Sequence, residues 1–314
     1  MKQSKGREFY DKYGIYVILI ALVVLLSVIT DGFFSWTNFT NILRTTSVYA
    51  ILACGMTFVM ISGCIDLSVG SIVALSGCVS AICMVNGIPM IISVIIGIGI
   101  GGLCGLLNGI FISIFRVPFF ITTAGMMYAA SGTALVITSE TPVNYLPESF
   151  EIFGARTFGL IPSQAIIAAI FFLICLFLIK QTKFGRYTYA IGSNERTAIL
   201  SGINVSKYRI LIYLLNGLAA GLAGIIVASR LKVGSPIVGS GYEIDAIAAA
   251  AIGGVSMAGG EGNIKKTMIG AFIICIIRTG LNILGISSSN QKIIIGAILV
   301  IVVAIDMLKS RNAE

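Results

Sequence analysis

The feature that most constrains this chain is a series of long apolar runs separated by short polar connections. Two of these runs are 165-AIIAAIFFLICLFLI-179 and 210-ILIYLLNGLAAGLAGIIVA-228. About 20 apolar residues in helical conformation match the hydrocarbon thickness of a bilayer. Only 11% of the residues are charged, whereas a soluble domain carries about 25%. Because so few charges cannot cover a water-facing surface, most of the surface must face lipid.

The runs predict an all-α membrane protein, a polytopic helical bundle of about ten transmembrane helices. At about 20 residues per span plus connections, the 314 residues form a single transmembrane domain, 1–314, without a sizeable soluble part. The basic and apolar N-terminal segment lacks an AxA-like cleavage site, so we expect an uncleaved first helix. The ten helices are expected at 15–30, 39–61, 67–85, 90–113, 119–138, 163–180, 208–229, 244–258, 266–284 and 292–308.

Lysine and arginine residues predict the orientation, because they collect in the cytoplasmic connections of membrane proteins. With the N-terminus inside, fifteen of the 21 Lys and Arg residues lie at the inner side, five lie at the outer side and Arg278 lies within a helix. Both termini are therefore expected in the cytoplasm, with loops 139–162 and 230–243 outside. The net charge of +8 belongs to these connections and predicts no nucleic-acid binding.

Several kinds of site are excluded by residue type. The chain has no His, and its seven Cys lie in apolar runs without a CxxC pair, which disfavours metal ligation and disulfides. The segment 259-GGEGNIKKT-267 nearly matches a P-loop, but Lys265 stands where that motif needs Gly. We therefore expect no metal and no cofactor on this chain, so any energy from a nucleotide must come from a partner.

A glycine stripe is expected to pack two helices together. Gly97, Gly101, Gly105 and Gly109 recur every four residues in the fourth predicted helix. This spacing places them on one face, where the absence of side chains lets two backbones approach. Gly97 and its neighbours also match GxGxxG, but no strand precedes them, so a dinucleotide site is rejected.

A carboxylate interrupts two apolar helices at 62-SGCIDLSVGS-71. A charge at the bilayer centre costs about 2.5–3.5 kcal/mol on insertion scales. Asp66 is therefore expected in a helix break, where it accepts hydrogen bonds from the backbone of Ser68 onward. Two readings remain open for Asp66, a helix cap at a turn and a residue of the translocation path.

Other polar residues in the apolar runs are candidates for the same path. Each is also explained by a hydrogen bond between helices, and an Asp245–Arg278 ion pair would satisfy two further buried charges. Leu107-Asn108-Gly109 and Gly280-Leu281-Asn282 lie in helices of opposite direction, a pattern consistent with an inverted repeat. The candidate path residues are Ser62, Asp66, Asn108, Thr122, Thr123, Asn216 and Asn282.

A long basic loop at about 181–207 separates two apolar runs at the inner side. Ser193 or Asn194 can cap a short helix there, and Glu195 lies in its first turn, where the helix dipole favours an anion. Gly202 can end it. A helix of about eight residues is unstable alone in water, so either lipid headgroups or another protein must hold it.

This loop and three other segments carry a family resemblance. FGRYTYAIGSNERTAILSGINV resembles the cytoplasmic coupling loop of permease subunits in bacterial sugar ABC importers of the ribose type. The same family is resembled by 55-GMTFVMISGCIDLSVGSIVALSG-77, 105-GLLNGIFISIFRVPFFITTAG-125 and 241-GYEIDAIAAAAIGGVSMAGGEGNIKKTMIGA-271. Together they place the resemblance over about residues 40–308.

The resemblance implies a channel-forming subunit in the bacterial inner membrane rather than an enzyme. Its implied partners are a second permease copy, a cytoplasmic ABC ATPase, an extracytoplasmic sugar-binding protein and membrane lipid. Ala198, Ile199 and Ile203 are expected on the side of the short helix that inserts into the ATPase. The family often has a Glu-Ala-Ala-like run where this chain has Glu195-Arg196-Thr197-Ala198, which makes Arg196 a candidate partner-specific contact.

Three alternatives stay open at this point. The wider family also imports branched-chain amino acids, urea or nucleosides. An ion-coupled secondary transporter would need intramembrane carboxylates, and Asp66 alone is a weak basis for it. An intramembrane enzyme is disfavoured, because the sequence has no His, no paired carboxylates and no metal-binding cluster. The leading prediction is ATP-driven uptake of a monosaccharide, with ribose first.

Overall fold

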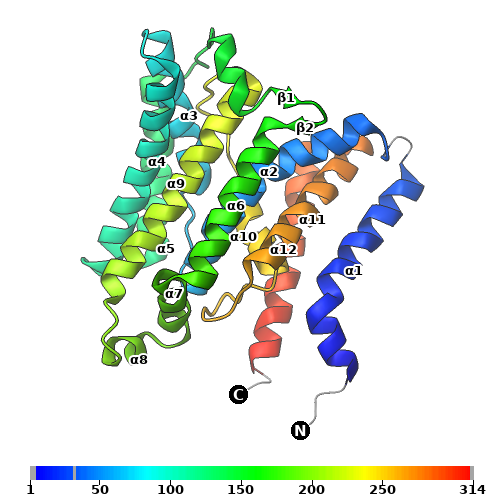
Figure 1. Cartoon of the computed structure of the whole chain (residues 1–314), viewed down its shortest axis with the longest axis vertical. Coiled ribbons are helices and arrows are strands. Elements are labelled where there is room, and N and C mark those ends of the chain that lie inside the picture. The colour runs from blue at the N-terminus through cyan, green and yellow to red at the C-terminus, as the bar shows by residue number, and fades with distance from the viewer. Residues whose placement is uncertain (1–4, 31–32, 312–314) are drawn as a thin grey trace.

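The computed structural model describes residues 5–30 and 33–311, and nearly all of its elements are helices (Figure 1). The loop between α5 and α6 carries a 3-10 helix and a two-stranded antiparallel hairpin, η1 (Glu148–Phe153), β1 (Thr157–Phe158) and β2 (Ile161–Pro162). The α-helices are α1 (Lys5–Ile29), α2 (Trp36–Ile61), α3 (Val69–Val85), α4 (Met90–Ser113), α5 (Phe119–Ile137), α6 (Ser163–Gln181), α7 (Lys183–Ser193), α8 (Glu195–Leu200), α9 (Val205–Leu231), α10 (Tyr242–Ile252), α11 (Ile264–Ile283) and α12 (Ser288–Arg311).

The predicted class, a polytopic helical membrane protein, is confirmed. Within the described residues, six helices are long and apolar enough to cross a bilayer: α2, α4, α5, α6, α9 and α11. Shorter apolar helical stretches occur in α1, α3 and α12. The helix expected at 244–258 ends earlier, at Ile252, because Gly253 and Gly254 follow and Gly254 has φ +77°. Its 11 residues span about 17 Å, too little to cross the membrane alone.

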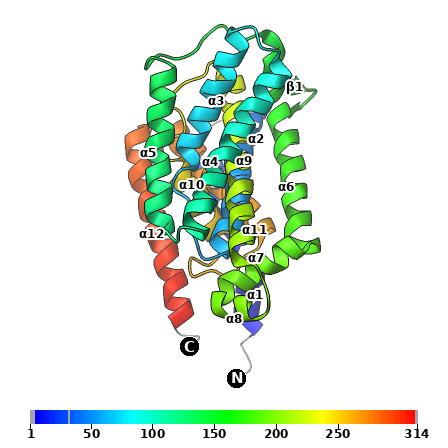
Figure 2. The same ribbon diagram turned by 90° about the vertical axis from the view of Figure 1, so that its left-hand side faces the viewer.

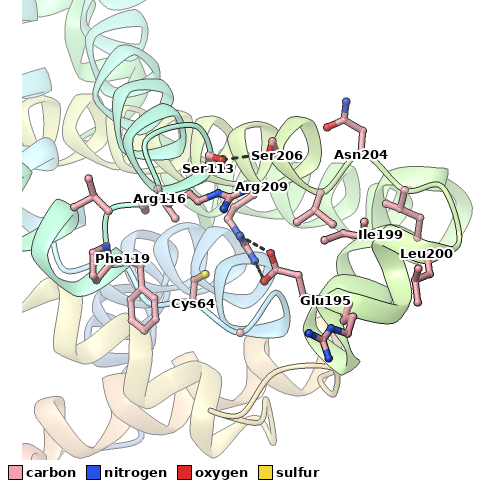
Figure 3. A pocket seen from close by; sticks show the side chains of 17 residues that line it. Cys64, Ser113, Arg116, Phe119, Glu195, Ile199, Leu200, Asn204, Ser206 and Arg209 are labelled. Atoms are coloured by element: carbon pink, nitrogen blue, oxygen red, sulfur yellow. Dashed lines mark hydrogen bonds and ion pairs between the residues drawn. The ribbon is translucent and has the colours of Figure 1, made fainter.

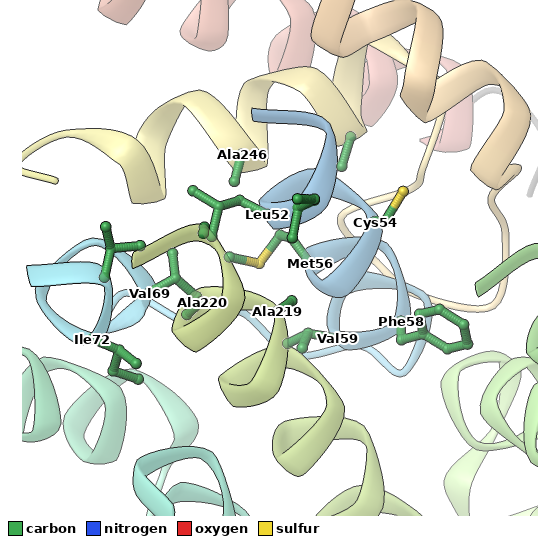
Figure 4. Packing of buried hydrophobic residues seen from close by; sticks show 14 of the residues in the cluster. Leu52, Cys54, Met56, Phe58, Val59, Val69, Ile72, Ala219, Ala220 and Ala246 are labelled. Carbon is green, nitrogen blue, oxygen red and sulfur yellow. The ribbon is translucent and has the colours of Figure 1, made fainter. Parts of the chain in front are cut away.

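Helix α2 forms the centre of the bundle, and 83% of its most apolar 18-residue stretch is buried. Its side chains pack against α3, α9 and α10, as Figure 4 shows for Leu52, Met56 and Val59 beside Ala219 and Ala220 of α9. Small Ala side chains on α9 let the larger α2 side chains fill the space between the two helices. Helix α5 lies at the edge of the bundle, since only 17% of its most apolar 18-residue stretch is buried.

Helix α4 lies beside α9 (Figure 2), and the glycines Gly101, Gly105 and Gly109 of its stripe lie against the α9 backbone, whereas Gly97 lies against Ile225 of α9 and Ser76 and Ser80 of α3. A Cβ added at Gly101 would lie 2.7 Å from Gly221 Cα, and one added at Gly105 would lie 2.9 Å from Gly217 Cα. Real Cβ atoms do not approach backbone so closely, so hydrogen is the only side chain that fits. Backbone therefore meets backbone along this contact, which we call the glycine seam (Gly101, Gly105 and Gly109 of α4).

The two ends of the bundle differ in structure. The described ends of α1 and α12 lie at the same end as α7 and α8, whereas η1 and the β-hairpin lie at the opposite end (Figure 1). At that opposite end, Arg44 of α2 donates to Thr157 Oγ1 at 3.2 Å. An ion pair with Glu151 raises the pKa of Lys232 above its ordinary value.

The glycine seam predicts a sharp contrast between two positions of α4. Gly105→Ala should destabilise the protein, because the new Cβ would overlap the carbonyl oxygen of Tyr213 and crowd Gly217; overpacking of this kind costs about 1–3 kcal/mol. Gly99→Ala is the matched control, since a Cβ there meets nothing within 4 Å. Thermal unfolding of the purified variants measures the difference, and equal midpoints would contradict the seam.

Candidate functional site

A buried carboxylate lies in the break between α2 and α3. Asp66 is fully buried, and its Oδ1 accepts hydrogen bonds from the Ser68 backbone N–H at 2.9 Å and the Ser68 hydroxyl at 2.6 Å. These bonds match the expectation that the freed backbone at the break satisfies Asp66. Ser68 occupies the N-cap position of α3 without a side-chain capping bond, and Asp66 lies two residues before it.

Two asparagines complete a network around this carboxylate. Asn216 of α9 donates to Asp66 Oδ2 at 2.9 Å, and Asn108 of α4 donates to the Ser68 hydroxyl at 3.0 Å. Tyr213 of α9 donates to the backbone oxygen of Ile65 at 3.2 Å. Buried charges are tolerated when hydrogen bonds satisfy them, and here three elements share that task. The network therefore ties the α2–α3 break to α4 and α9.

The path candidates do not converge on one open passage within the described part of the chain. Asp66, Asn108 and Asn216 are fully buried. The remaining candidates lie elsewhere and bond locally: Ser62 to Val59 O, Thr122 to Pro118 O, Thr123 to Phe119 O, and Asn282 as the acceptor of Gln291 Nε2. A role in translocation stays a prediction for all seven, and it would require another conformation for the buried ones.

A second buried charge is neutralised by an ion pair. Both oxygens of Asp245 in α10 lie 2.8 Å from Arg278 Nη2 in α11, which confirms the pairing anticipated for these two residues. The Arg278 guanidinium also lies 5.8 Å from the centre of the Tyr49 ring in α2. The ion pair thereby fastens α10 to α11, and the contact with the Tyr49 ring connects α11 to α2.

The basic loop contains two helices rather than one. Asn194 caps α8 by accepting from the Thr197 N–H at 2.9 Å, and Gly202 has φ +81° after the helix ends. The preceding helix α7 was not predicted from the sequence. Its signal was Thr182, an N-cap residue type whose side chain accepts from Gly185 N–H.

The apolar residues of α8 do not lie on one exposed side. Ala198 is buried, 3% exposed, and packs with Ile191 and Val205 against its own chain, which corrects its expected place on a docking surface. Ile199 is 56% exposed and Leu200 is 83% exposed. The exposed apolar side chains of α8 are therefore Ile199 and Leu200, and the sequence reasoning did not single out Leu200.

The end of α7 touches the core of the bundle through backbone. A Cβ at Gly192 would overlap Ile61 O at the end of α2 and lie 2.6 Å from Gly260 N, and Gly260 N–H donates to the same Ile61 oxygen at 2.8 Å. Tyr189 donates to Gly262 O at 2.8 Å, and burial raises the pKa of its phenol. A displacement of α7 would thus reach α2 and the loop before α11 directly.

A cavity of about 1070 Å³ opens beside α8. Its walls come from the end of α4, the connection to α5, α8, the start of α9 and the Gly63–Cys64 turn. Figure 3 shows Glu195 of α8 joined across it to Arg209 of α9, with a closest distance of 2.8 Å. This ion pair connects the short helix to a helix that also carries Asn216 of the Asp66 network.

The geometry around Asp66 predicts a reciprocal rescue. Asp66→Asn should lower the thermal midpoint, because the new NH2 group must face another donor in either rotamer. In one rotamer it faces the Asn216 NH2 group, and in the other it faces the Ser68 N–H and hydroxyl. An unsatisfied buried group costs about 1–3 kcal/mol. Asn216→Asp alone should also destabilise, since two carboxylates then meet. The double variant restores a donor–acceptor pair and should recover most of the loss. Strictly additive effects in the double variant would rule out the contact.

The chain is similar over nearly its whole length to known permease proteins. A family described as "Branched-chain amino acid transport system / permease component" matches residues 38–303. The chain is 40% identical to the ribose import permease of Escherichia coli strain K12, over 97% of this chain and 98% of the relative. It is 41% identical to the ribose import permease of Bacillus subtilis strain 168, over 96% and 94%.

A permease for another sugar is similar over a comparable length. Identity to the D-allose transport system permease of Escherichia coli strain K12 is 37%, over 96% of this chain and 94% of the relative. No solved structure matches the chain. Nearly full-length similarity of both chains, together with the helical membrane architecture, shows that this chain belongs to the branched-chain amino acid transport system permease family.

Proposed function

We propose that this chain is the channel-forming permease subunit of an ATP-driven importer for a monosaccharide, with ribose as the first candidate. The observation that carries the proposal is the similarity over nearly the whole chain to two ribose import permeases, at 40% and 41% identity. The D-allose permease is also similar, at 37%, so a related sugar is the runner-up. Branched-chain amino acids, which the family description names, are the alternative substrate class.

In this proposal the chain performs no covalent chemistry. A separate ABC ATPase binds ATP and Mg²⁺, and an extracytoplasmic binding protein delivers the sugar. Each partner can bias the passage only by binding one of its two states more tightly than the other. The buried Asp66 network and the Asp245–Arg278 pair then hold the helices within one state.

The proposed orientation places α7, α8 and both termini in the cytoplasm of a bacterial cell. It is supported by the Lys and Arg distribution of the sequence and by the common end at which α7, α8 and the described ends of α1 and α12 lie (Figure 1). Ten helices then cross or enter the inner membrane, including the short α10. Lipid would cover the exposed apolar side chains at the edge of the bundle, and a second permease copy would complete the channel.

The proposal includes an inverted repeat. Asn108 and Asn282 are the corresponding residues of the two halves, yet their surroundings differ. Asn108 is fully buried and bonds to Ser68, whereas Asn282 is exposed and accepts from Gln291 at 2.7 Å. A shared ancestry of the halves would therefore have left similar helices with different contacts.

Helix α8 is the proposed contact with the ATPase. Its exposed residues Ile199 and Leu200 provide an apolar anchor, and Arg196 provides a charge beside it. The backbone contact of Gly192 with Ile61 and the Glu195–Arg209 ion pair then connect a docked α8 to α2 and α9. Through these two contacts, ATPase closure reaches the helices that surround Asp66.

Reconstitution tests the substrate and the energy source together. Liposomes that contain the permease with its ATPase inside and its binding protein outside should accumulate labelled ribose. They should do so only when ATP is enclosed in the liposomes, on the side of the ATPase. Allose and leucine serve as competitors for the runner-up and the alternative. Accumulation driven by a proton or sodium gradient without ATP would contradict the importer, and inhibition by leucine but not by sugars would reassign its substrate.

The α8 contact makes a separate prediction about assembly. The double variant Ile199→Asp and Leu200→Asp should reduce ATPase co-purification on the order of tenfold, because central apolar anchors dominate interfaces. The fold should persist, since both side chains are exposed. Lys265→Asp is the control, an exposed residue outside α8. Full co-purification with the double variant would remove α8 from the contact.

A further inference from the structure

The cavity beside α8 has an unusual balance of charge. Three arginines from three segments line it, Arg116 between α4 and α5, Arg196 of α8 and Arg209 of α9. The sole acidic residue among its lining residues is Glu195. Arginine stays protonated at every physiological pH, so the cavity keeps a net positive charge.

Several hydrogen-bond donors in this cavity have no acceptor. Among the described residues, neither Arg116 nor Arg196 has an acidic partner, since the ion pairs found there involve other basic residues. Arg209 uses both Nη atoms on Glu195, but its buried Nε is unpaired. The Ser113 hydroxyl is also buried without a partner. Arg116 and Arg196 are exposed, so the cavity offers an anion two guanidinium groups that no acidic side chain neutralises.

The backbone at Arg116 supports the same reading. Arg116 has φ +56° and follows the end of α4, where Val117 N–H donates back to Phe111 O at 3.1 Å. Glycine is the usual residue at such a left-handed position after a helix, and another side chain is strained there. An arginine at this place points to a use for its guanidinium rather than for the turn itself.

We propose that this cavity binds a phosphate-bearing anion. The planar guanidinium group presents paired N–H donors that match phosphate oxygens, and charge-assisted bonds of this kind are about twice as strong as neutral ones. Figure 3 shows Arg116, Arg209 and Ser113 on one wall of the cavity. In this proposal one phosphate group in the cavity accepts from the exposed guanidinium groups of Arg116 and Arg196, which have no acidic partner among the described residues.

Two sources of this phosphate share the same chemistry. One is a lipid headgroup, favoured by two exposed apolar side chains next to Arg116, Ile114 at 60% and Phe115 at 65% exposure. The other is free inorganic phosphate, which reaches the cavity from the aqueous side. Both place negative charge beside Arg209, so both compete with Glu195 for its guanidinium.

The competition gives the site two variants with opposite effects. Arg116→Gln with Arg196→Gln removes two cations and should weaken anion binding at least about tenfold. Glu195→Gln removes the competing carboxylate and frees the Nη donors of Arg209, so it should strengthen binding. Lys183→Gln with Arg186→Gln is the matched control, because it removes two cations from α7, outside the cavity lining.

The experiment uses the purified full-length chain and needs neither transport nor partners. Native mass spectrometry counts phosphatidylglycerol and phosphatidylcholine retained from mixed vesicles, and thermal unfolding is followed while inorganic phosphate is raised at constant ionic strength. Retained phosphatidylglycerol that falls in the Arg116/Arg196 variant and rises in Glu195→Gln supports the site with a lipid source. The same pattern in the phosphate-dependent midpoint, without retained lipid, supports it with free phosphate.

Either of two results overturns the proposal. One is equal binding by the Arg116/Arg196 variant and by the Lys183/Arg186 control, which would mean that only net charge matters. The other is the absence of both lipid retention and phosphate stabilisation in the unaltered chain and in Glu195→Gln, a variant that keeps all three arginines. Because no sugar is involved, failure here leaves the importer proposal standing.

Discussion

The close contact between α4 and α9 is the interaction on which the rest of the structure depends. Glycines on both helices allow backbone to meet backbone, with no room for a Cβ at Gly101 or Gly105. The contact sets the separation of the helices in the middle of the bundle. The same two helices supply Asn216 to the carboxylate of Asp66 and Asn108 to the Ser68 hydroxyl beside it. Two helices held farther apart could not both reach the break between α2 and α3.

The same contact also organises the end of the bundle that carries α8. At the end of α4, the Ser206 hydroxyl of α9 donates to Ser113 O of α4 at 3.3 Å. One turn further along α9, the Arg209 guanidinium donates to Glu195 of α8. A bilayer interior offers no water to satisfy polar groups, so the buried Asp66 and Asp245 need partners from the protein. The Asp66 network and the Asp245–Arg278 pair meet that requirement.

The sequence predicted most of the helices because their length and apolarity are local properties. It also predicted that Asp66 would bond to Ser68, since a carboxylate in a helix break has its own backbone within reach. It could not predict that Asn108 and Asn216 meet there, because that depends on how α4 packs on α9. The burial of Ala198 likewise depends on the unpredicted helix α7, and the end of α10 depends on Gly253 and Gly254.

An importer of this kind must expose α8 to the cytoplasm and η1 to the outside, because its ATPase and its binding protein lie on opposite sides. The direct measurement is labelling of intact cells with a membrane-impermeant maleimide, in a variant whose native cysteines are replaced. Ser149→Cys in η1 and Ser193→Cys at the end of α7 both carry exposed side chains. The account predicts that Ser149→Cys is labelled and that Ser193→Cys is protected until the cells are permeabilised. Labelling of Ser193→Cys alone in intact cells would contradict it.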